Sequence, residues 1–450
     1  MDNHSEAFNN QYTFIPESLS VTRRKGKKSD FSSKGIVLLF LIFTIYLVLP
    51  LVDIPLLGLS VSAPLFFFIA MYSIFRSPQR WSAANQKWIL LAILIWSGIF
   101  ISTMFNGILS GGQEFDREGF ILLIQNAYWL LVFVITSYFA SLKGVLEKTA
   151  KVLGWAIFTL ALVRLFEAAA WGAINTYEET TRILTPNEYG FLFSTFFPLL
   201  LEPVFSKSEK RKFLMVIRML ITTFAVIINS SRSSWISVAA AIIFFTLVLV
   251  IIRPRKGWLG LLPIGLVLVS ILFGLQLLPD SVNAAINQRA STFLNLEQDK
   301  SYVFRQMMVQ KGLKLFKESP LIGVGASRFR KESAELELSG VFQLYSQSRF
   351  DRKSAHNSYI GFLAESGLVG SIPLGLLILL LAFKGFKAAL WQTRSEELWA
   401  LSILTSFLGM SIHMWTISAL AGTVTWFVYG LVAALILLCN AKGSRRRFFK

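Results

Sequence analysis

Long apolar segments, separated by short polar ones, follow one another along most of the chain. A bilayer crossing needs about 17–25 mostly apolar residues. Twelve segments fit this description, at about 36–52, 57–75, 88–105, 119–139, 152–172, 188–205, 213–229, 233–252, 258–278, 357–382, 398–415 and 419–438. Backbone polar groups have no water partner in lipid, so each segment is expected to be a helix. The pattern predicts an all-α polytopic membrane protein with about twelve transmembrane helices.

One polar connection is much longer than the others. Residues 280–355 separate the ninth and tenth predicted spans. Within them, residues 301–319 carry Phe304, Met308 and Leu313 at helical spacing with lysines between, which predicts an amphipathic helix ending at Pro320. A glycine-rich turn follows at 321–329. Long loops are usually functional, so this partly helical exterior loop is where a site is expected.

The distribution of lysine and arginine predicts the orientation of the spans. With the N-terminus in the cytoplasm, the inside segments hold 27 of these residues and the short outside loops hold three. The predicted division is therefore a disordered basic cytoplasmic tail at 1–34, spans one to nine within 35–279, the exterior loop, spans ten to twelve within 356–440, and a basic cytoplasmic tail at 441–450. The net charge of +18 then reflects topology and contact with membrane lipids, not nucleic-acid binding.

The amino-acid composition limits the kinds of cofactor that the protein could bind. The chain is 54% hydrophobic and only 16% charged, and it has a single cysteine. No CxxC or HxxxH spacing could hold a metal, and no GxxxxGK[ST] loop could hold phosphates. Neither a metal nor another cofactor is expected.

His356 is one of three histidines, and it stands where the exterior loop meets span ten. With Ser354 as the N-cap, His356 would lie in the first helical turn, whose positive end favours a neutral ring. Such a ring could act as a general base towards a hydroxyl nucleophile. The alternative is an interfacial histidine bonded to a neighbouring loop. His413 is either a satisfied core residue or part of the same cleft.

Three arginines are candidates for binding an anion. Arg182 precedes span six, and Arg232 lies in a serine-rich hairpin between spans seven and eight, on the side where cations are depleted. Either could simply be an interfacial arginine, but the tight turn around Arg232 favours packing of its guanidinium against donors for an anion. Arg305 opens the amphipathic helix and, taken alone, would be a solvated surface residue.

Two further polar residues lie in span ten. Glu365 is nine residues after His356, which is about 180° around an ideal helix, so the two are not expected to form a dyad. Asn357 and Glu365 share one stripe, so Glu365 is expected to brace span ten against a neighbour. Arg164 and Glu167 in span five are expected to pair with each other.

Four segments resemble the recurrent segments of the O-antigen ligase and polymerase superfamily. They are RILTPNEYGFLFSTFFPLLL (182–201), NSSRSSWISVAAAIIFF (229–245), ESPLIGVGASRF (318–329) and SAHNSYIGFLAESGLVGSI (354–372). The resemblance covers roughly residues 180–375. Twelve spans with the long loop between nine and ten also resemble the ligase layout.

The resemblance implies a bacterial inner-membrane glycosyltransferase of the GT-C type with a periplasmic site and loop. Such enzymes transfer a glycan from undecaprenyl diphosphate to an acceptor sugar hydroxyl, with inversion and without a metal. Ligases use lipid A-core as acceptor, and polymerases use another lipid-linked repeat. By position, His356 resembles the catalytic histidine, Arg232 and Arg305 resemble the arginines that bind the donor diphosphate, and Arg182 is a weaker candidate.

Two alternatives to a ligase remain. The first is an O-antigen or exopolysaccharide polymerase, although no RX10G spacing, which some polymerases carry, occurs in the outer loops. The second is a transporter or flippase for a lipid-linked glycan, although the two halves of the chain show no internal symmetry.

Overall fold

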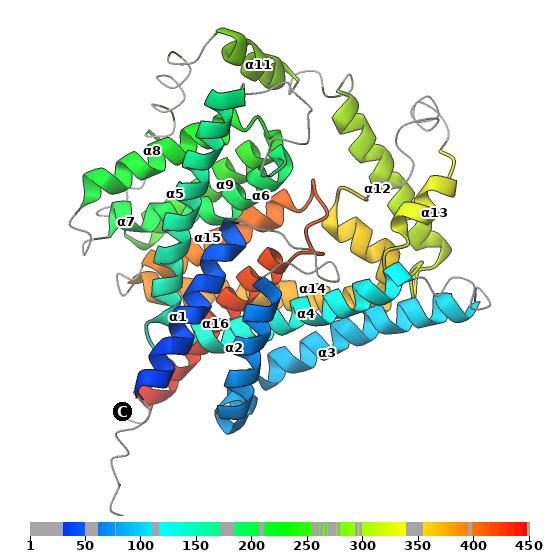
Figure 1. Cartoon of the computed structure of the whole chain (residues 1–450), viewed down its shortest axis with the longest axis horizontal. Helices are drawn as coiled ribbons and strands as arrows, with labels where there is room; N and C mark the ends of the chain where they lie inside the picture. The colour runs from blue at the N-terminus through cyan, green and yellow to red at the C-terminus, as the bar shows by residue number, and fades with distance from the viewer. Residues whose placement is uncertain are drawn as a thin grey trace, which may run out of the picture.

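The computed structural model describes residues 30–49, 62–76, 78–109, 117–171, 184–206, 211–253, 280–292, 299–338, 354–394 and 398–447, with a few single positions between them. The described part is built from helices (Figure 1). They are α1 (Asp30–Val48), α2 (Ser62–Arg76), α3 (Pro78–Leu109), α4 (Arg117–Ala140), α5 (Val145–Trp171), α6 (Pro186–Phe196), the 3₁₀ turn η1 (Phe197–Leu200), α7 (Leu201–Phe205), α8 (Lys212–Ile228), α9 (Arg232–Ile252), α11 (Asp280–Ser291), α12 (Lys300–Glu318), α13 (Phe329–Glu335), α14 (Ser358–Arg394), α15 (Leu398–His413) and α16 (Thr423–Arg447).

Six of the described helices are long and apolar enough to cross a membrane. Their apolar parts are Gln86–Ile108, Gly119–Ala140, Val145–Ala170, Arg232–Ile252, Ser358–Thr393 and Thr423–Asn440. Shorter apolar helices occur at Gly35–Val48, Ala63–Tyr72 and Leu398–His413. These helices are those of a polytopic membrane protein. The total of twelve spans stays a prediction, because most of the run at 258–278 lies outside the described residues.

The predicted run at 188–205 is a helix with a change of winding in its middle. It consists of α6, the 3₁₀ turn η1 and the short α7. Pro198 has no N–H to donate to the preceding turn, and it lies in η1. The chain therefore tightens at the proline and resumes as α7, while η1 stays buried among the surrounding helices.

The helices that surround the site pack at very short distances. Helices α3, α4, α14 and α16 lie against one another and cross the lower part of Figure 1. Gly98 of α3 lies so close to Gly370 of α14 that a Cβ on Gly98 would come 2.6 Å from the Cα of Gly370. Helices α6, α9 and α15 also pack together. The site lies where these two groups of helices meet.

The segment between α9 and α14 contributes α11, α12 and α13. Its residues 339–353 lie outside the described part of the chain, as do residues 1–29 of the predicted tail. Phe304 and Met308 of α12 are buried, as predicted, but Leu313 is 39% exposed. The buried stripe instead continues through Lys311, whose Nζ donates to the Ser333 carbonyl at 2.6 Å. Leu313 points away because α13 and α14 both pack on the other face of α12.

Candidate active site

Helix α14 is interrupted near its beginning, and the glycine-rich turn fills the interruption. Gly367 has φ +57° and ψ −160°, which breaks the helix. The amides of Val324 and Gly325 donate to the carbonyls of Ala364 and Glu365 at 2.9 and 3.0 Å. On the other side of the break, the amides of residues 368 and 369 donate to the carbonyls of residues 320 and 321. Two of the segments that carry the family resemblance therefore bind each other directly.

This arrangement depends on glycine at the break. A Cβ on Gly367 would lie 2.5 Å from the backbone of Leu321 and of Gly323, and the positive φ disfavours any side chain. From the facing helix α3, Ser102 donates to the Glu365 carbonyl at 2.7 Å and Asn106 donates to the Gly323 carbonyl at 3.0 Å. The beginning of α14 is thus fixed from two sides.

His356 lies in the turn just before α14, which corrects the predicted helix start. The helix begins at Ser358, and the Asn357 side chain accepts from the amides of Tyr359 and Ile360, both at 3.0 Å. Asn357 is therefore the N-cap, in place of Ser354. His356 has φ +47°, a left-handed conformation that is rare for residues other than glycine. This conformation directs the histidine out of the helical path.

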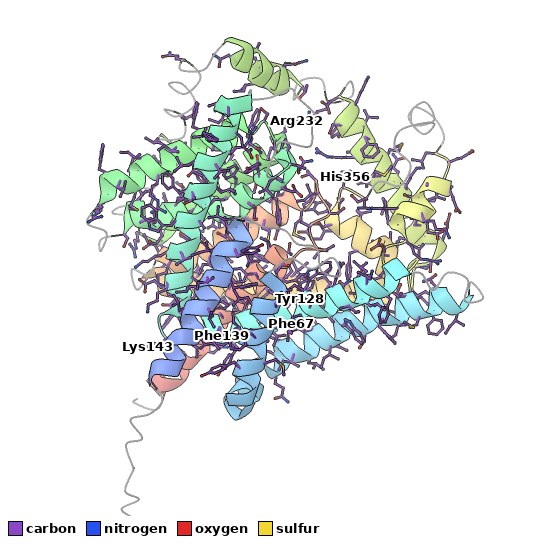
Figure 2. All side chains as sticks on the ribbon, in the orientation of Figure 1. Phe67, Tyr128, Phe139, Lys143, Arg232 and His356 are labelled. Atoms are coloured by element: carbon purple, nitrogen blue, oxygen red, sulfur yellow. The ribbon has the colours of Figure 1, made fainter. Side chains whose placement is uncertain are left out.

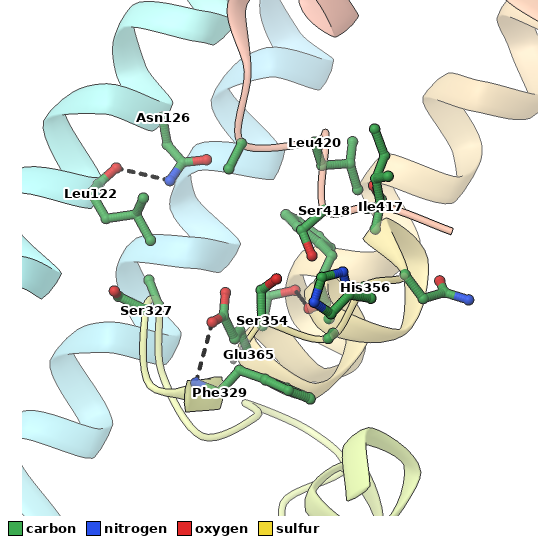
Figure 3. Close-up of a pocket in the computed structure, with 18 of the residues that line it drawn as sticks. Leu122, Asn126, Ser327, Phe329, Ser354, His356, Glu365, Ile417, Ser418 and Leu420 are labelled. Atoms are coloured by element: carbon green, nitrogen blue, oxygen red, sulfur yellow. Dashed lines mark hydrogen bonds between the residues drawn. The ribbon is translucent and has the colours of Figure 1, made fainter. Parts of the chain in front are cut away.

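A cavity of about 520 Å³ opens beside His356. Its wall combines carboxylate, amide and hydroxyl groups with two tryptophans, and the residues include Asn126, Trp129, Asn187, Glu188, Ser327, Arg330, Ser354, His356, Asn357, Glu365, Ser418 and Trp426. Figure 3 shows Ser418 near His356, on the segment that links α15 and α16. Polar groups beside aromatic side chains suit a sugar, which offers both hydroxyl and C–H groups.

Glu365 lines the same cavity as His356, although the sequence predicted that they face apart. The prediction counted His356 as a helical residue, whereas its turn precedes the helix. The Glu365 Oε1 accepts from the Phe329 amide at 3.2 Å (Figure 3). Glu365 thus joins α14 to the start of α13 through its side chain, and its carboxylate lies at the cavity wall.

Arg232 is held by the segment that precedes α12. Its Nη2 lies 2.7 Å from the Asp299 Oδ1, and its Nη1 donates to the Thr292 hydroxyl at 2.8 Å. Asp299 is also the N-cap of α12, accepting from the Tyr302 amide at 2.7 Å. The sequence predicted that the serines of the hairpin would pack around Arg232. Instead, Ser231 and Ser233 turn towards each other, 3.2 Å apart.

Arg305 lies on α12, nearly two turns beyond the Asp299 cap. The preceding residue, Phe304, packs edge to face on the His356 ring, with centroids 5.5 Å apart. The charge of Arg305 also acts on His413 at the end of α15. Helix α12 therefore carries Arg305 next to the residue that contacts His356, while Figure 2 shows Lys143 far from His356 and Arg232.

Residues 217–375 match the model of one protein family, whose description is O-antigen ligase. Over this segment, the chain is therefore similar to proteins of the O-antigen ligase and polymerase superfamily. The resemblance expected from the sequence is confirmed for this segment. No curated protein matches the chain.

The O-antigen ligase match contains most of the candidate residues. It begins in α8 and ends in α14, and it includes Arg232, Arg305, His356, Asn357 and Glu365. Arg182 lies outside both the match and the described residues. The cavity wall, by contrast, also draws on α4, α6 and α16, which the match does not cover. The family segment therefore builds one side of the cavity, and the rest of the chain builds the other.

His413 is a core residue and does not line the cavity. It is fully buried, with Nδ1 2.9 Å from the Ser194 hydroxyl and Nε2 3.4 Å from the Ser233 hydroxyl. Ser194 donates its single proton to the Gly190 carbonyl at 2.7 Å, so Nδ1 must carry the proton that Ser194 accepts. Nε2 is then an acceptor for Ser233. His413 thus connects α15 to α6 and α9.

Some polar residues of the cavity were not predicted. Glu188 belongs to a capping box with Thr185 at the start of α6, a pattern visible in the sequence as TPNE. Arg330 and Ser418 stand in segments without a recognisable motif.

The predicted pair of Arg164 and Glu167 is present at 3.7 Å, and Arg164 also donates to Asn229 at 3.3 Å. Within the described residues, no group of three metal-ligating side chains occurs.

Proposed function

We propose that the protein is an inner-membrane glycosyltransferase of the O-antigen ligase type. It takes a glycan from undecaprenyl diphosphate and transfers it to a sugar hydroxyl of lipid A-core, on the periplasmic side, with both chain termini in the cytoplasm. The family match of residues 217–375 and the apolar helices support a membrane enzyme that acts on lipid-linked glycans. The distribution of positive charge in the sequence supports the orientation.

One observation carries the proposal. His356 stands on the wall of a cavity whose polar and aromatic side chains suit a sugar, and its ring contacts Phe304 of α12. The same helix carries Arg305, and its N-cap Asp299 holds Arg232. The proposed base and the two proposed diphosphate ligands are therefore connected through one helix.

The proposed reaction is a direct displacement. The acceptor hydroxyl attacks the anomeric carbon, the new C–O bond forms as the bond to the diphosphate oxygen breaks, and the hydroxyl proton passes to His356. General base catalysis of this kind contributes about 10²–10⁴ in rate. Undecaprenyl diphosphate leaves with the bonding electron pair, and the guanidinium groups of Arg232 and Arg305 stabilise its negative charge.

Asn357 and Glu365 support this arrangement without reacting. Asn357 fixes the start of α14 and with it the turn that presents His356. Glu365 holds the Phe329 amide and so positions the glycine-rich turn at the cavity wall. Arg182, which precedes α6, is proposed as a further diphosphate ligand on the resemblance alone.

The test is a transfer assay with the purified protein, a lipid-linked glycan donor and lipid A-core. The variant is His356→Asn, because asparagine adopts the left-handed conformation readily but cannot act as a base. A matched control is His4→Asn, in the N-terminal segment. We expect His356→Asn to lose about 10²-fold or more in kcat with an unchanged unfolding midpoint. Full activity in His356→Asn would refute the mechanism.

The glycan phenotype of a deletion strain distinguishes a polymerase from a ligase. The cavity supports a polymerase equally, because another lipid-linked repeat also presents a sugar hydroxyl. Loss of polymer from lipid A-core, with lipid-linked polymer accumulating, identifies a ligase. Glycans of a single repeat identify a polymerase. Product formation by the purified protein in the transfer assay argues against a transporter.

A further inference from the structure

A second cavity, of about 360 Å³, lies at the other end of α15. Its wall comes from α5, η1, α7, α8 and the start of α15. Helices α5, α7 and α8 gather on the left of Figure 1. Helix α15 runs 16 residues from this end to His413, which is about 24 Å. The second cavity is therefore separate from the candidate active site.

The wall of this cavity carries a net positive charge. It contains Lys151, Arg211 and Arg218, and one acidic residue, Glu202. Lys151 also bonds Glu147, one turn earlier on α5, at 2.7 Å. Even with Glu147 included, the cations outnumber the carboxylates. A cavity of this charge favours an anion.

The guanidinium of Arg218 is held firmly although α8 is an apolar helix. Arg218 is 3% exposed, and its Nη2 donates to the Gly154 carbonyl at 2.6 Å. Its guanidinium carbon lies 3.6 Å from the centre of the Trp155 ring. Burying a cation in an apolar helix is costly, and such residues usually mark a functional position. The stacked, hydrogen-bonded guanidinium is preorganised at the cavity wall.

The rim of the cavity is apolar and accessible. Trp155 is 45% exposed and Leu214 is 37% exposed, and both line the cavity. The neighbouring Phe213 is 80% exposed and follows Lys212 directly. Exposed tryptophan and aliphatic side chains beside lysine and arginine are typical of the interface between hydrocarbon and lipid headgroups. The rim of the cavity thus carries the side chains that are typical of positions beside phospholipid headgroups.

We propose that this cavity binds the phosphate headgroup of an anionic phospholipid. Arg211, Arg218 and Lys151 contact the phosphate, while the acyl chains lie along the exposed side chains of Trp155 and Leu214. A basic pocket between transmembrane helices is the usual form of such a site. Free phosphate would use the same cations but would gain nothing from the apolar rim, so the rim favours the lipid.

The test is native mass spectrometry of the full-length protein in detergent with added lipid. Phosphatidylglycerol, phosphatidylcholine and inorganic phosphate are titrated separately. The test variant is K151Q/R211Q, which removes two cations at the rim and leaves the buried Arg218 in place. The matched control is K143Q/K148Q, which removes two exposed lysines, one from the turn between α4 and α5 and one from the first turn of α5.

We expect the unaltered protein to retain phosphatidylglycerol in preference to phosphatidylcholine. K151Q/R211Q should weaken phosphatidylglycerol binding about 25-fold, because each of the two cations that contact the phosphate contributes a factor of about five. The control should bind as the unaltered protein does, because its lysines lie outside the cavity wall. Equal binding of the two lipids, or an equal loss in the control, overturns the proposal. Displacement of the lipid by equimolar inorganic phosphate also overturns it, since it would identify a site for the free anion.

Discussion

The Arg232 guanidinium and the Asp299 carboxylate lie 2.7 Å apart, although 67 positions separate them in the sequence. Both side chains are largely buried, at 11% and 8% exposure. Asp299 also caps α12, so this ion pair fixes the start of the helix that carries Arg305 against the start of α9. The contact has a structural role, and the proposed role of Arg232 in binding the donor is additional to it.

Substitutions of the two partners of this ion pair distinguish a structural role of Arg232 from a catalytic one. Asp299→Asn keeps a good N-cap but removes the charge, and Arg232→Gln removes the cation. Each should lower the free energy of unfolding by about 3 kcal/mol, because each leaves one charge uncompensated. Only Arg232→Gln should also lower kcat for glycan transfer, by on the order of 10²-fold. Thermal unfolding in detergent and the transfer assay measure the two effects, and equal losses of activity would assign Arg232 a purely structural role.

Arg305 provides a second test of diphosphate binding. Its side chain is half-buried on α12, so Arg305→Gln should leave the unfolding midpoint nearly unchanged. Loss of one cation at the developing diphosphate should reduce kcat by on the order of 10²-fold. Lys317→Gln, which removes an exposed charge from the last turn of the same helix, is the control. If the two variants lose activity equally, the effect is one of general surface charge.

The interruption of α14 should tolerate no side chain at Gly367. Gly367→Ala places a Cβ 2.5 Å from the backbone of Leu321 in a conformation of positive φ. We expect it to lower the free energy of unfolding by about 2 kcal/mol or more. Gly375→Ala, on the same helix with no atom within 4 Å of the added Cβ, should be neutral or slightly stabilising. Similar unfolding midpoints for both variants would contradict the described contact.

The cavity beside His356 should be closed by a bulky residue at its edge. Ser418 is exposed and lines the cavity, so Ser418→Trp can be accommodated without disturbing the core. The indole should compete with the acceptor sugar and raise the acceptor KM on the order of ten-fold, with the unfolding midpoint unchanged. Ser418→Ala is the control and should behave as the unaltered protein. An unchanged KM in Ser418→Trp would mean that the acceptor binds elsewhere.

His413 should matter for stability and not for the reaction itself. His413→Ala leaves Ser194 and Ser233 facing a buried void, and we expect a loss of about 2–5 kcal/mol in the free energy of unfolding. His413→Gln fills the space and retains one hydrogen bond, so it should lose less. Activity per folded molecule should stay within a few-fold in His413→Gln, and an abolished kcat there would place His413 in the site after all.

The sequence predicts the helices well, because a long apolar segment that is buried in lipid or in the protein core must satisfy its backbone hydrogen bonds internally. Five of the candidate residues, from Arg232 to Glu365, lie in a segment that matches the O-antigen ligase family. The helical phase around His356 was wrong, because it depends on which residue caps α14. Asn357 takes that position through two amide contacts, which residue type alone does not distinguish from a Ser354 cap.

The residues that contact Arg232 and Glu365 from distant parts of the chain could not be predicted from the sequence, for a different reason. Asp299 and Thr292, which bind Arg232, stand in an ordinary polar segment with no local pattern. The contacts of Glu365 with the 323–329 turn arise only because Gly367 breaks the helix, and nothing in a hydropathy profile shows a break of one residue. Arg182 stays a prediction.

The break at Gly367 also has a consequence for how the protein is made. An interrupted helix in an apolar segment leaves amide and carbonyl groups that lipid cannot satisfy. Here the amides and carbonyls of residues 320–325 satisfy them, and these residues precede α14 in the chain. When α14 emerges during synthesis, the backbone groups that pair with its interruption have therefore already been made.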